Sequence, residues 1–172
     1  MRVIAFFMAA ALLLAGCAED KPREPKASAA PTVTVPTMPA AAEKNSEAGA
    51  IAFVKHYIDV FNYASNTGDV KELQKLFESG CKACRTYLDT IESAHANGAD
   101  VDGFDWTVSN LVADQGSTFN LAINSGKYRT RDTAHSEWTE VLAAKYELVV
   151  ELSRREGGWL VAELYLPGKE GT

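Results

Sequence analysis

The chain has 172 residues, of which 47% are hydrophobic and 23% charged, and its formal net charge at pH 7 is −6. This acidic balance disfavours nucleic-acid binding, which needs a cationic surface to displace counterions from phosphates. The three cysteines and six prolines are distributed unevenly, and they divide the chain into three parts.

Residues 1–16 have the pattern of a secretory signal peptide. Arg2 precedes an apolar run from Val3 to Ala15, which is shorter than the about 20 residues that a membrane-spanning helix needs. The run ends in Leu14-Ala15-Gly16-Cys17, which resembles the lipobox of bacterial lipoproteins. We therefore expect Cys17 to be the lipid attachment site and the protein to be anchored on the extracytoplasmic face of the cell membrane. An ordinary secretory signal with an incidental cysteine is the alternative.

Residues 17–44 read as the lipidated cysteine and a Pro/Ala-rich tether. Five of the six prolines fall here, no hydrophobic period is present, and acidic and basic residues are equal in number. Such a composition is typical of a linker rather than of a folded unit. Residues 45–172 remain as a single domain with 19 acidic and 12 basic side chains.

The first half of this domain predicts three helices. Asn45 or Ser46 can cap a helix that runs to about Ser65, with two apolar stripes at helical spacing. Thr67-Gly68-Asp69 then ends it, because Gly68 suits the left-handed position after a helix. A short second helix carries Leu73, Leu76 and Phe77 inward. A third starts near Cys81, ends at Asn97-Gly98, and is expected to direct Tyr87, Leu88 and Ile91 into the core.

The second half predicts strands. Phe104, Trp106 and Val108 alternate, and the phase shift at Asn110 is typical of a bulge. Further strands are expected at residues 119–123, 128–130, 141–152 and 159–166, with a hairpin turn at Glu156-Gly157-Gly158. Asp100, Asp102 and Asp105 read as a solvated acidic loop rather than a calcium site, because no EF-hand spacing is present. Helices followed by an antiparallel sheet indicate the α+β class.

The order of elements, ending in "GGWLVAELYL", resembles the nuclear transport factor two-like (SnoaL-like) fold, a strongly curved antiparallel sheet forming a cone around the first helix. Residues 45–84 also resemble the actinobacterial lipoproteins classed as domain of unknown function 6318. The shared features are Asn62-Tyr63-Ala64, Thr67-Gly68-Asp69 and Cys81-x-x-Cys84. These resemblances imply an architecture and a location, but no activity.

The Cys81-x-x-Cys84 motif could be a structural disulfide, a redox centre or half of a metal site. Lipidation of Cys17 leaves one cysteine pair, which is normally oxidised outside the cytoplasm. A redox centre would require a strand before the motif, whereas a helix is predicted there. A zinc site would need further ligands, but no second cysteine pair or His-x₃₋₅-His is present, and His56, His95 and His135 are scattered. We therefore favour a disulfide and expect no metal and no cofactor.

Six aromatic residues could line the concave side of such a cone. They form either a filled core or a pocket for a small apolar ligand, in which Tyr57 would be the polar group; they are Phe53, Tyr57, Trp106, Phe119, Tyr146 and Trp159. A filled cone favours a non-enzymatic module that binds an envelope protein or small apolar ligand. An open, acid-containing pocket would favour an isomerase or dehydratase. Asp59 is two residues from Tyr57, so the two point to different helix faces, and no catalytic residue is assigned.

Overall fold

The computed structural model describes residues 33–167. Helices come first and antiparallel sheets follow, so the α+β prediction is confirmed. The predicted signal peptide and Cys17 lie outside the described residues. The described elements are η1 (Ala40–Glu43), α1 (Glu47–Thr67), η2 (Leu73–Leu76), α2 (Lys82–Ala96), β1 (Asp100–Asp102), β2 (Trp106–Ala113), β3 (Thr118–Ser125), β4 (Tyr128–Arg131), β5 (Thr139–Val141), β6 (Ala144–Arg155) and β7 (Gly158–Tyr165).

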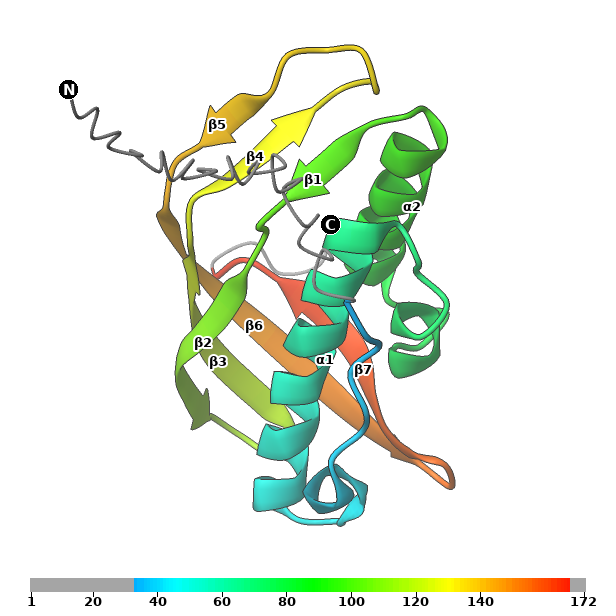
Figure 1. Cartoon of the computed structure of the whole chain (residues 1–172). Coiled ribbons are helices and arrows are strands. Elements are labelled where there is room, and N and C mark those ends of the chain that lie inside the picture. The colour runs from blue at the N-terminus through cyan, green and yellow to red at the C-terminus, as the bar shows by residue number, and fades with distance from the viewer. Residues whose placement is uncertain (1–32, 168–172) are drawn as a thin grey trace, which may run out of the picture. The chain divides into compact units, whose positions relative to one another are not determined.

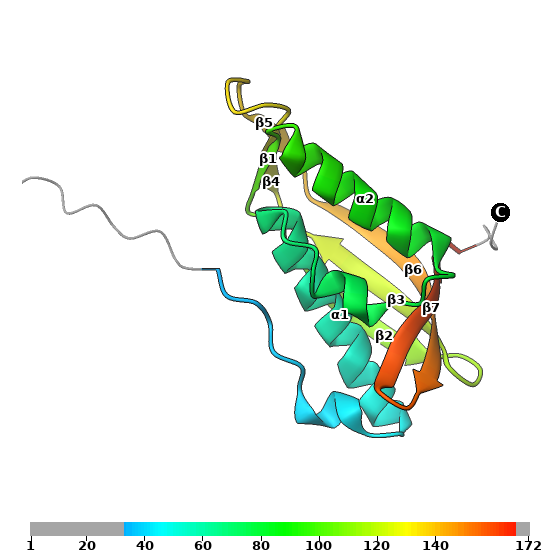
Figure 2. The ribbon, with the colours of Figure 1, turned by 90° about the vertical axis from the view of Figure 1, so that its right-hand side faces the viewer.

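The strands form two antiparallel sheets. The larger has the order β2-β3-β6-β7 and is covered on one face by α1 and α2, while the smaller has the order β1-β4-β5 and lies at one end (Figure 1). Figure 2 shows the two helices side by side over the larger sheet. The core lies between these layers. No helix within residues 33–167 combines the length and apolar character needed to cross a membrane.

Helix α1 is capped by Ser46, one of the two predicted caps, and ends at Thr67, two residues after the predicted end at about Ser65. The Ser46 side chain accepts a hydrogen bond from the Gly49 N–H at 3.1 Å, which satisfies one of the free donors of the first turn. Gly68 ends the helix in the left-handed region, with φ +74°. A side chain at this position would be strained and would also meet the His95 ring, because a Cβ atom would lie 2.7 Å from its Cγ.

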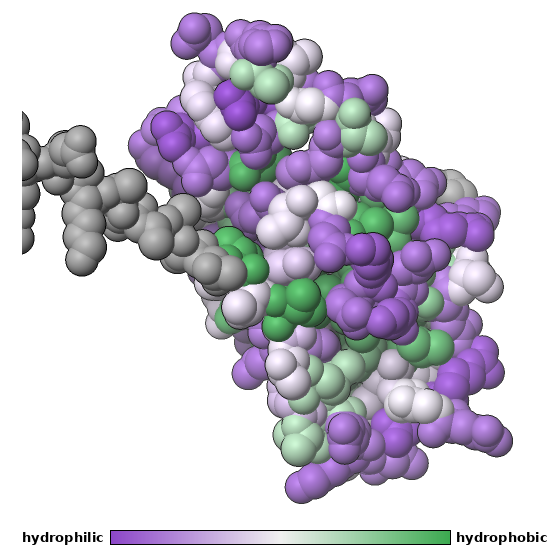
Figure 3. All heavy atoms as spheres, turned by 45° about the vertical axis from the view of Figure 1, so that its right-hand side comes forward, coloured by the Kyte–Doolittle hydropathy of each residue, from purple (hydrophilic) through white to green (hydrophobic). Residues whose placement is uncertain are grey.

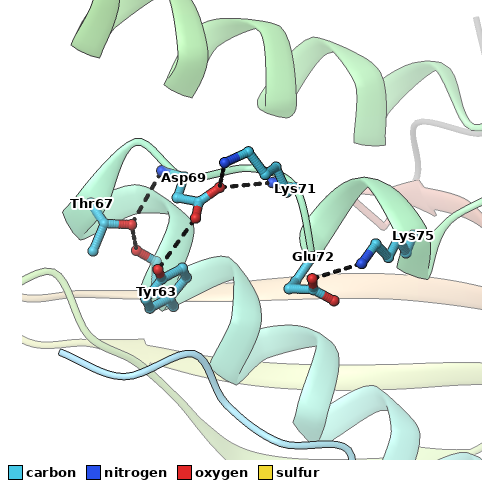
Figure 4. Close-up of polar contacts among 6 residues, drawn as sticks. All are labelled: Tyr63, Thr67, Asp69, Lys71, Glu72 and Lys75. Carbon is cyan, nitrogen blue, oxygen red and sulfur yellow. Dashed lines mark hydrogen bonds and ion pairs between the residues drawn. The ribbon is translucent and has the colours of Figure 1, made fainter.

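The turn after α1 is held by local polar contacts (Figure 4). The Asp69 N–H donates to the Thr67 hydroxyl at 3.2 Å, and the Lys71 N–H donates to the Asp69 carboxylate at 3.3 Å. Thr67 in turn donates to the carbonyl oxygen of Tyr63 at 2.8 Å. The Thr67-Gly68-Asp69 motif is therefore a helix stop, and its residues are occupied by structural bonds.

Two asparagines join α1 to the chain that enters β2. The Asn62 amide donates to the Trp106 carbonyl and accepts from the Trp106 N–H, both at 2.9 Å. Asn66, one helical turn later, makes the same pair of bonds with Phe104, at 2.6 and 3.0 Å. A side-chain amide thus occupies the place of a neighbouring strand at this edge, which leaves no polar backbone group of these two residues unpaired.

The larger sheet follows the predicted alternation. The register of β2 against β3 shifts between Val108 and Asn110, as the phase of the apolar residues predicted. Along β3, Phe119, Leu121 and Ile123 are all buried on the helix side. The long strand predicted at residues 141–152 is β6, which starts later, at Ala144, and ends at Arg155, whereas Val141 is the last residue of β5 in the small sheet.

The small sheet corrects one prediction. Asp100 and Asp102 were expected in a solvated loop, but they form β1 and pair with β4. Arg131 contacts Asp100 at 2.7 Å, and Arg129 contacts Asp102, so opposite charges face each other across the two strands. Both guanidinium groups also lie over the Trp138 ring, within 4.7 and 5.0 Å of its centroid.

The segment between α1 and α2 contains a short 3-10 turn in place of the predicted second helix. The expected second helix is only the 3-10 turn η2, although Leu73, Leu76 and Phe77 are buried as predicted. Cys81 and Cys84 form a disulfide with a Cα–Cα distance of 5.3 Å, and both residues are at most 1% exposed. The bond lies across the first turn of α2, where the Cys81 sulfur also accepts from the Cys84 N–H.

Tyr87 is not in the core, contrary to the prediction for α2. It is 38% exposed, whereas Leu88 beside it is 7% exposed. The reason is that α2 packs through a narrow strip, on which Cys84 and Leu88 are its buried residues.

The end of the predicted tether packs on the domain. In η1, Ala42 is 2% exposed, and the Lys44 carbonyl accepts a hydrogen bond from the Trp159 ring at 3.0 Å. Arg154 stacks over the same ring and donates to the Glu43 carbonyl at 2.9 Å. Residues 40–44 therefore contact the β6–β7 hairpin.

The Asn62 bonds can be tested by mutation. Asn62→Ala should lower the free energy of unfolding by about 1–3 kcal/mol, because the N–H and C=O of Trp106 both lose their partner. Asn120→Ala is the matched control, since Asn120 is exposed on β3 and makes no side-chain hydrogen bond within residues 33–167. Denaturant unfolding of both variants measures the difference, and equal midpoints would contradict the role given to Asn62.

The disulfide should be structural. Replacing Cys81 and Cys84 together by serine should lower the free energy of unfolding by about 1–3 kcal/mol and leave the fold intact, because closing this short loop restricts the unfolded chain. Adding a reductant to the denaturation series should shift the wild type by the same amount and should not shift the double variant. Free thiols at both positions in the unreduced, unfolded wild type would refute the disulfide.

Candidate functional site

The most distinctive surface of the described residues is a group of six aromatic rings, here called the aromatic cluster. It lies where the C-terminal half of α1 meets α2 and the first residues of β2, β4 and β6. Neighbouring ring centroids are 5.0 to 6.0 Å apart. The members are Phe61, Tyr87, Phe104, Trp106, Tyr128 and Tyr146.

The cluster is packed at its centre and open at its edge. Phe61 is 5% exposed and stacks on Trp106 at 5.0 Å, whereas Tyr87 and Tyr146 are 38% and 39% exposed. Figure 3 shows that, on the face of the helices, apolar residues reach the surface in patches among hydrophilic ones. Tyrosine and tryptophan with one face buried and one face free are the residue types that anchor protein interfaces.

The backbone under these rings is fixed. Asn62 and Asn66 hold the main chain of Trp106 and Phe104, so both side chains project from a restrained segment. Tyr146 is held by the pairing of β6 with β3, opposite Ile123. A surface whose backbone is already ordered loses little conformational entropy when it binds.

The six aromatic residues predicted as a pocket are separated into three places. Phe53, Tyr57 and Phe119 are at most 2% exposed and belong to the core. Trp106 and Tyr146 belong to the aromatic cluster. Trp159 lies near the β6–β7 hairpin, where it contacts Lys44. Trp106 and Trp159 also pack against the core that contains Phe53, Tyr57 and Phe119.

The Tyr57 hydroxyl is a buried polar group without a hydrogen-bond partner within residues 33–167. Burial, and to a lesser degree the neighbouring Tyr87, raises the pKa of this hydroxyl far above its usual value. It stays protonated at any physiological pH, so it cannot act as a base there. An unpartnered buried hydroxyl also costs stability, roughly 1–3 kcal/mol.

Asp59 lies two residues after Tyr57 on α1, a spacing that puts the two side chains on different faces of the helix. Partial burial raises the pKa of this carboxyl, Asp105 raises it further, and His56 opposes the shift. The pKa of His56 is lowered, mainly by burial and against the pull of Asp59. The charged residues that influence the pKa of Asp59 are thus His56 and Asp105.

Within residues 33–167, no group of three or more His, Cys, Asp or Glu side chains could hold a metal ion. The Nε2 atom of His95 lies 3.0 Å from the carbonyl oxygen of Ser65 and is hydrogen-bonded to it. The sulfurs of Cys81 and Cys84 are buried as well, which leaves them inaccessible to a redox partner.

Sequence reasoning found two of the six cluster residues and missed four. Phe61 lay in the first predicted helix and Phe104 in a predicted strand, but neither pattern shows which rings meet in space. Tyr128 and Tyr87 belong to segments that are far apart in the sequence from Trp106, and the fold alone brings them together.

Comparison with known proteins gives a fold and a family. No curated protein matches the chain. The intermembrane space region of the chloroplast protein ARC6 is similar over 72% of this chain and 97% of its own, with 13% identity and a TM-score of 0.54. Aln2 from a Streptomyces species is similar over 72% and 93%, with 10% identity and a TM-score of 0.49. An NTF2-like protein with a cystatin-like fold from Novosphingobium aromaticivorans is similar over 71% and 85%, with 14% identity and a TM-score of 0.43.

At 13% identity, the likeness to the ARC6 region shows a shared fold only. The family is shown by a sequence match that extends over residues 25–161, which is most of the chain and includes nearly every element of the domain. The protein is thus a member of the family of unknown function DUF6318.

Proposed function

We propose that the protein is an actinobacterial lipoprotein, anchored through Cys17 to the extracytoplasmic face of the cell membrane. We further propose that its domain is a non-enzymatic module that binds another protein of the cell envelope. The observation that carries this function is the partly exposed aromatic cluster on a restrained backbone. Binding of a small apolar ligand at the same rings is the competing outcome of the test.

The N-terminal sequence supports the anchoring. Arg2, the short apolar run and Leu14-Ala15-Gly16-Cys17 together have the composition of a lipoprotein signal. A diacylglyceryl group and a further acyl chain would hold the protein stably on a bilayer. The Cys81–Cys84 disulfide fits the same compartment, because disulfides persist outside the reducing cytoplasm.

The packing of η1 limits the reach of the tether. Because residues 40–44 pack on the domain, only the stretch from Cys17 to about Pro39 is available as a linker. A Pro-rich tether of this length would span about 25 Å or more. A partner would therefore be met close to the membrane surface.

A protein partner is favoured over a small ligand by the filled interior. Phe53, Tyr57 and Phe119 occupy the space under α1 where a cone-shaped pocket would be, and each is at most 2% exposed. The free aromatic surface is at the edge of the cluster, at Tyr87 and Tyr146. Such a surface is suited to a partner that covers it, with the rings as anchors.

The binding surface can be located by crosslinking in cells. A photo-crosslinking residue at position 87 or 146 should form an adduct with a specific envelope protein, whereas the same residue at Val112 or Leu142 should not. Val112 and Leu142 are suitable controls because they are 51% and 67% exposed and lie outside the cluster.

With the partner identified, Tyr87→Ala and Tyr146→Ala together should weaken binding at least tenfold, about 1.4 kcal/mol, and Val112→Ala should not. Equal crosslinking from all four positions would contradict the proposal, and an adduct only with a small molecule would favour the competing outcome.

The anchor can be tested separately. Cys17→Ser should move the protein from the membrane fraction to the soluble fraction, or leave an uncleaved precursor, because the acyl chains can no longer be attached. The variant with serine at both Cys81 and Cys84 is the matched control and should remain in the membrane fraction. Intact mass measurement should find the lipid on the wild type and the control only. Membrane retention of Cys17→Ser at its unmodified mass would rule out this anchor.

A further inference from the structure

A second surface, separate from the aromatic cluster, is a cleft between the η2 region and α2. Its volume is about 280 Å³. Pockets for drug-sized ligands have volumes of about 300–1,000 Å³, so this cleft has room for a small molecule only. The lining residues are Gln74, Phe77, Ser79, Arg85, Leu88 and Asp89.

The cleft has an apolar floor and a polar rim. Phe77 and Leu88 are 8% and 7% exposed, so only a small part of each remains free at the floor. Gln74 and Ser79 stand at the rim, and neither side chain makes a hydrogen bond to any of residues 33–167.

The rim also carries one unpaired charge of each sign. Arg85 and Asp89 are four residues apart on α2, a spacing at which opposite charges often pair. Their side chains do not come within ion-pair distance, and neither has another charged or hydrogen-bonding partner in the described part of the chain. An arginine and an aspartate that line one cleft and remain unpaired can receive a ligand that carries both charges.

The frame of the cleft is rigid. Phe77 bridges Val161 on β7, and the Glu78 N–H donates to the Val161 carbonyl at 2.9 Å. The Glu78 carboxylate is held by Arg155 at 2.6 Å and by Ser153. These hydrogen bonds lower the pKa of Glu78, with the Ser153 bond the largest cause, so the carboxylate stays ionised. The disulfide of Cys81 closes the segment on its other side.

We propose that this cleft binds a small zwitterion, a free α-amino acid with an apolar side chain. Arg85 receives the carboxylate, Asp89 receives the ammonium group, and the side chain lies on Phe77 and Leu88. Leucine is small enough to enter a cleft of this volume. Because both charges are exposed, the affinity is modest, with a Kd on the order of 1 mM. The site is independent of the aromatic cluster and of the anchor.

Amide chemical shifts of the full chain in detergent micelles provide the test, with L-leucine as the probe. Leucine should give saturable shifts confined to residues 74–79 and 82–90. Leucinamide lacks the carboxylate and N-acetyl-leucine lacks the ammonium group, so each should bind at least several-fold more weakly than leucine. Glycine, which lacks the side chain, should bind more weakly as well.

Two variants and two matched controls assign the charges. Arg85→Gln should weaken leucine and N-acetyl-leucine several-fold and leave leucinamide unchanged, because it removes only the exposed carboxylate partner. Asp89→Asn should weaken leucine and leucinamide and leave N-acetyl-leucine unchanged. Lys55→Gln and Glu92→Gln remove the same charges at exposed positions outside the cleft and should leave leucine binding unchanged. Absence of saturable shifts, shifts centred elsewhere, or equal effects of variants and controls would overturn the proposal.

Discussion

The contact on which the structure depends is the double pairing of two asparagine amides with the backbone of the chain entering β2. Each amide of Asn62 and Asn66 satisfies one N–H and one C=O at an open edge, where otherwise only water could do so. Because the amides are one helical turn apart, they fix both the rotation of α1 and its position along the sheet. The ring positions of Phe104 and Trp106 follow from this, and so does the surface that we assign to binding.

Local features were predictable because their causes are local. The Ser46 cap, the stop at Gly68, the bulge near Asn110 and the alternation of β3 each depend on residues a few positions apart. The pairing of β1 with β4 was not predictable, because the strands are about 30 residues apart and β1 is only three residues long. From the sequence alone, the three aspartates indicate a solvated loop. Only the fold shows that two of them, Asp100 and Asp102, are paired with arginines.

The candidate site was predictable only in part for a related reason. Aromatic residues at strand and helix spacing could be assigned to the inner face, and Phe53, Tyr57 and Phe119 do lie there. Whether an inward ring ends in the core, at the open edge or beside a hairpin depends on how far each strand extends past the helix. Trp159 is an example. Its ring donates a hydrogen bond to the Lys44 carbonyl and lies under the Arg154 guanidinium group, and neither residue belongs to β7.

The packing of η1 would have a mechanical consequence for the lipid-anchored protein that we propose. Tension on the tether would enter the domain at residues 40–44 and would first load the hydrogen bonds from Trp159 to Lys44 and from Arg154 to Glu43. These two hydrogen bonds can break one after the other rather than at the same time. The core and the Asn62 pairing, which lie further along the chain, would be shielded until η1 had come away. In the proposed anchored protein, the short helix would thus protect the core from tension applied at its N-terminal side.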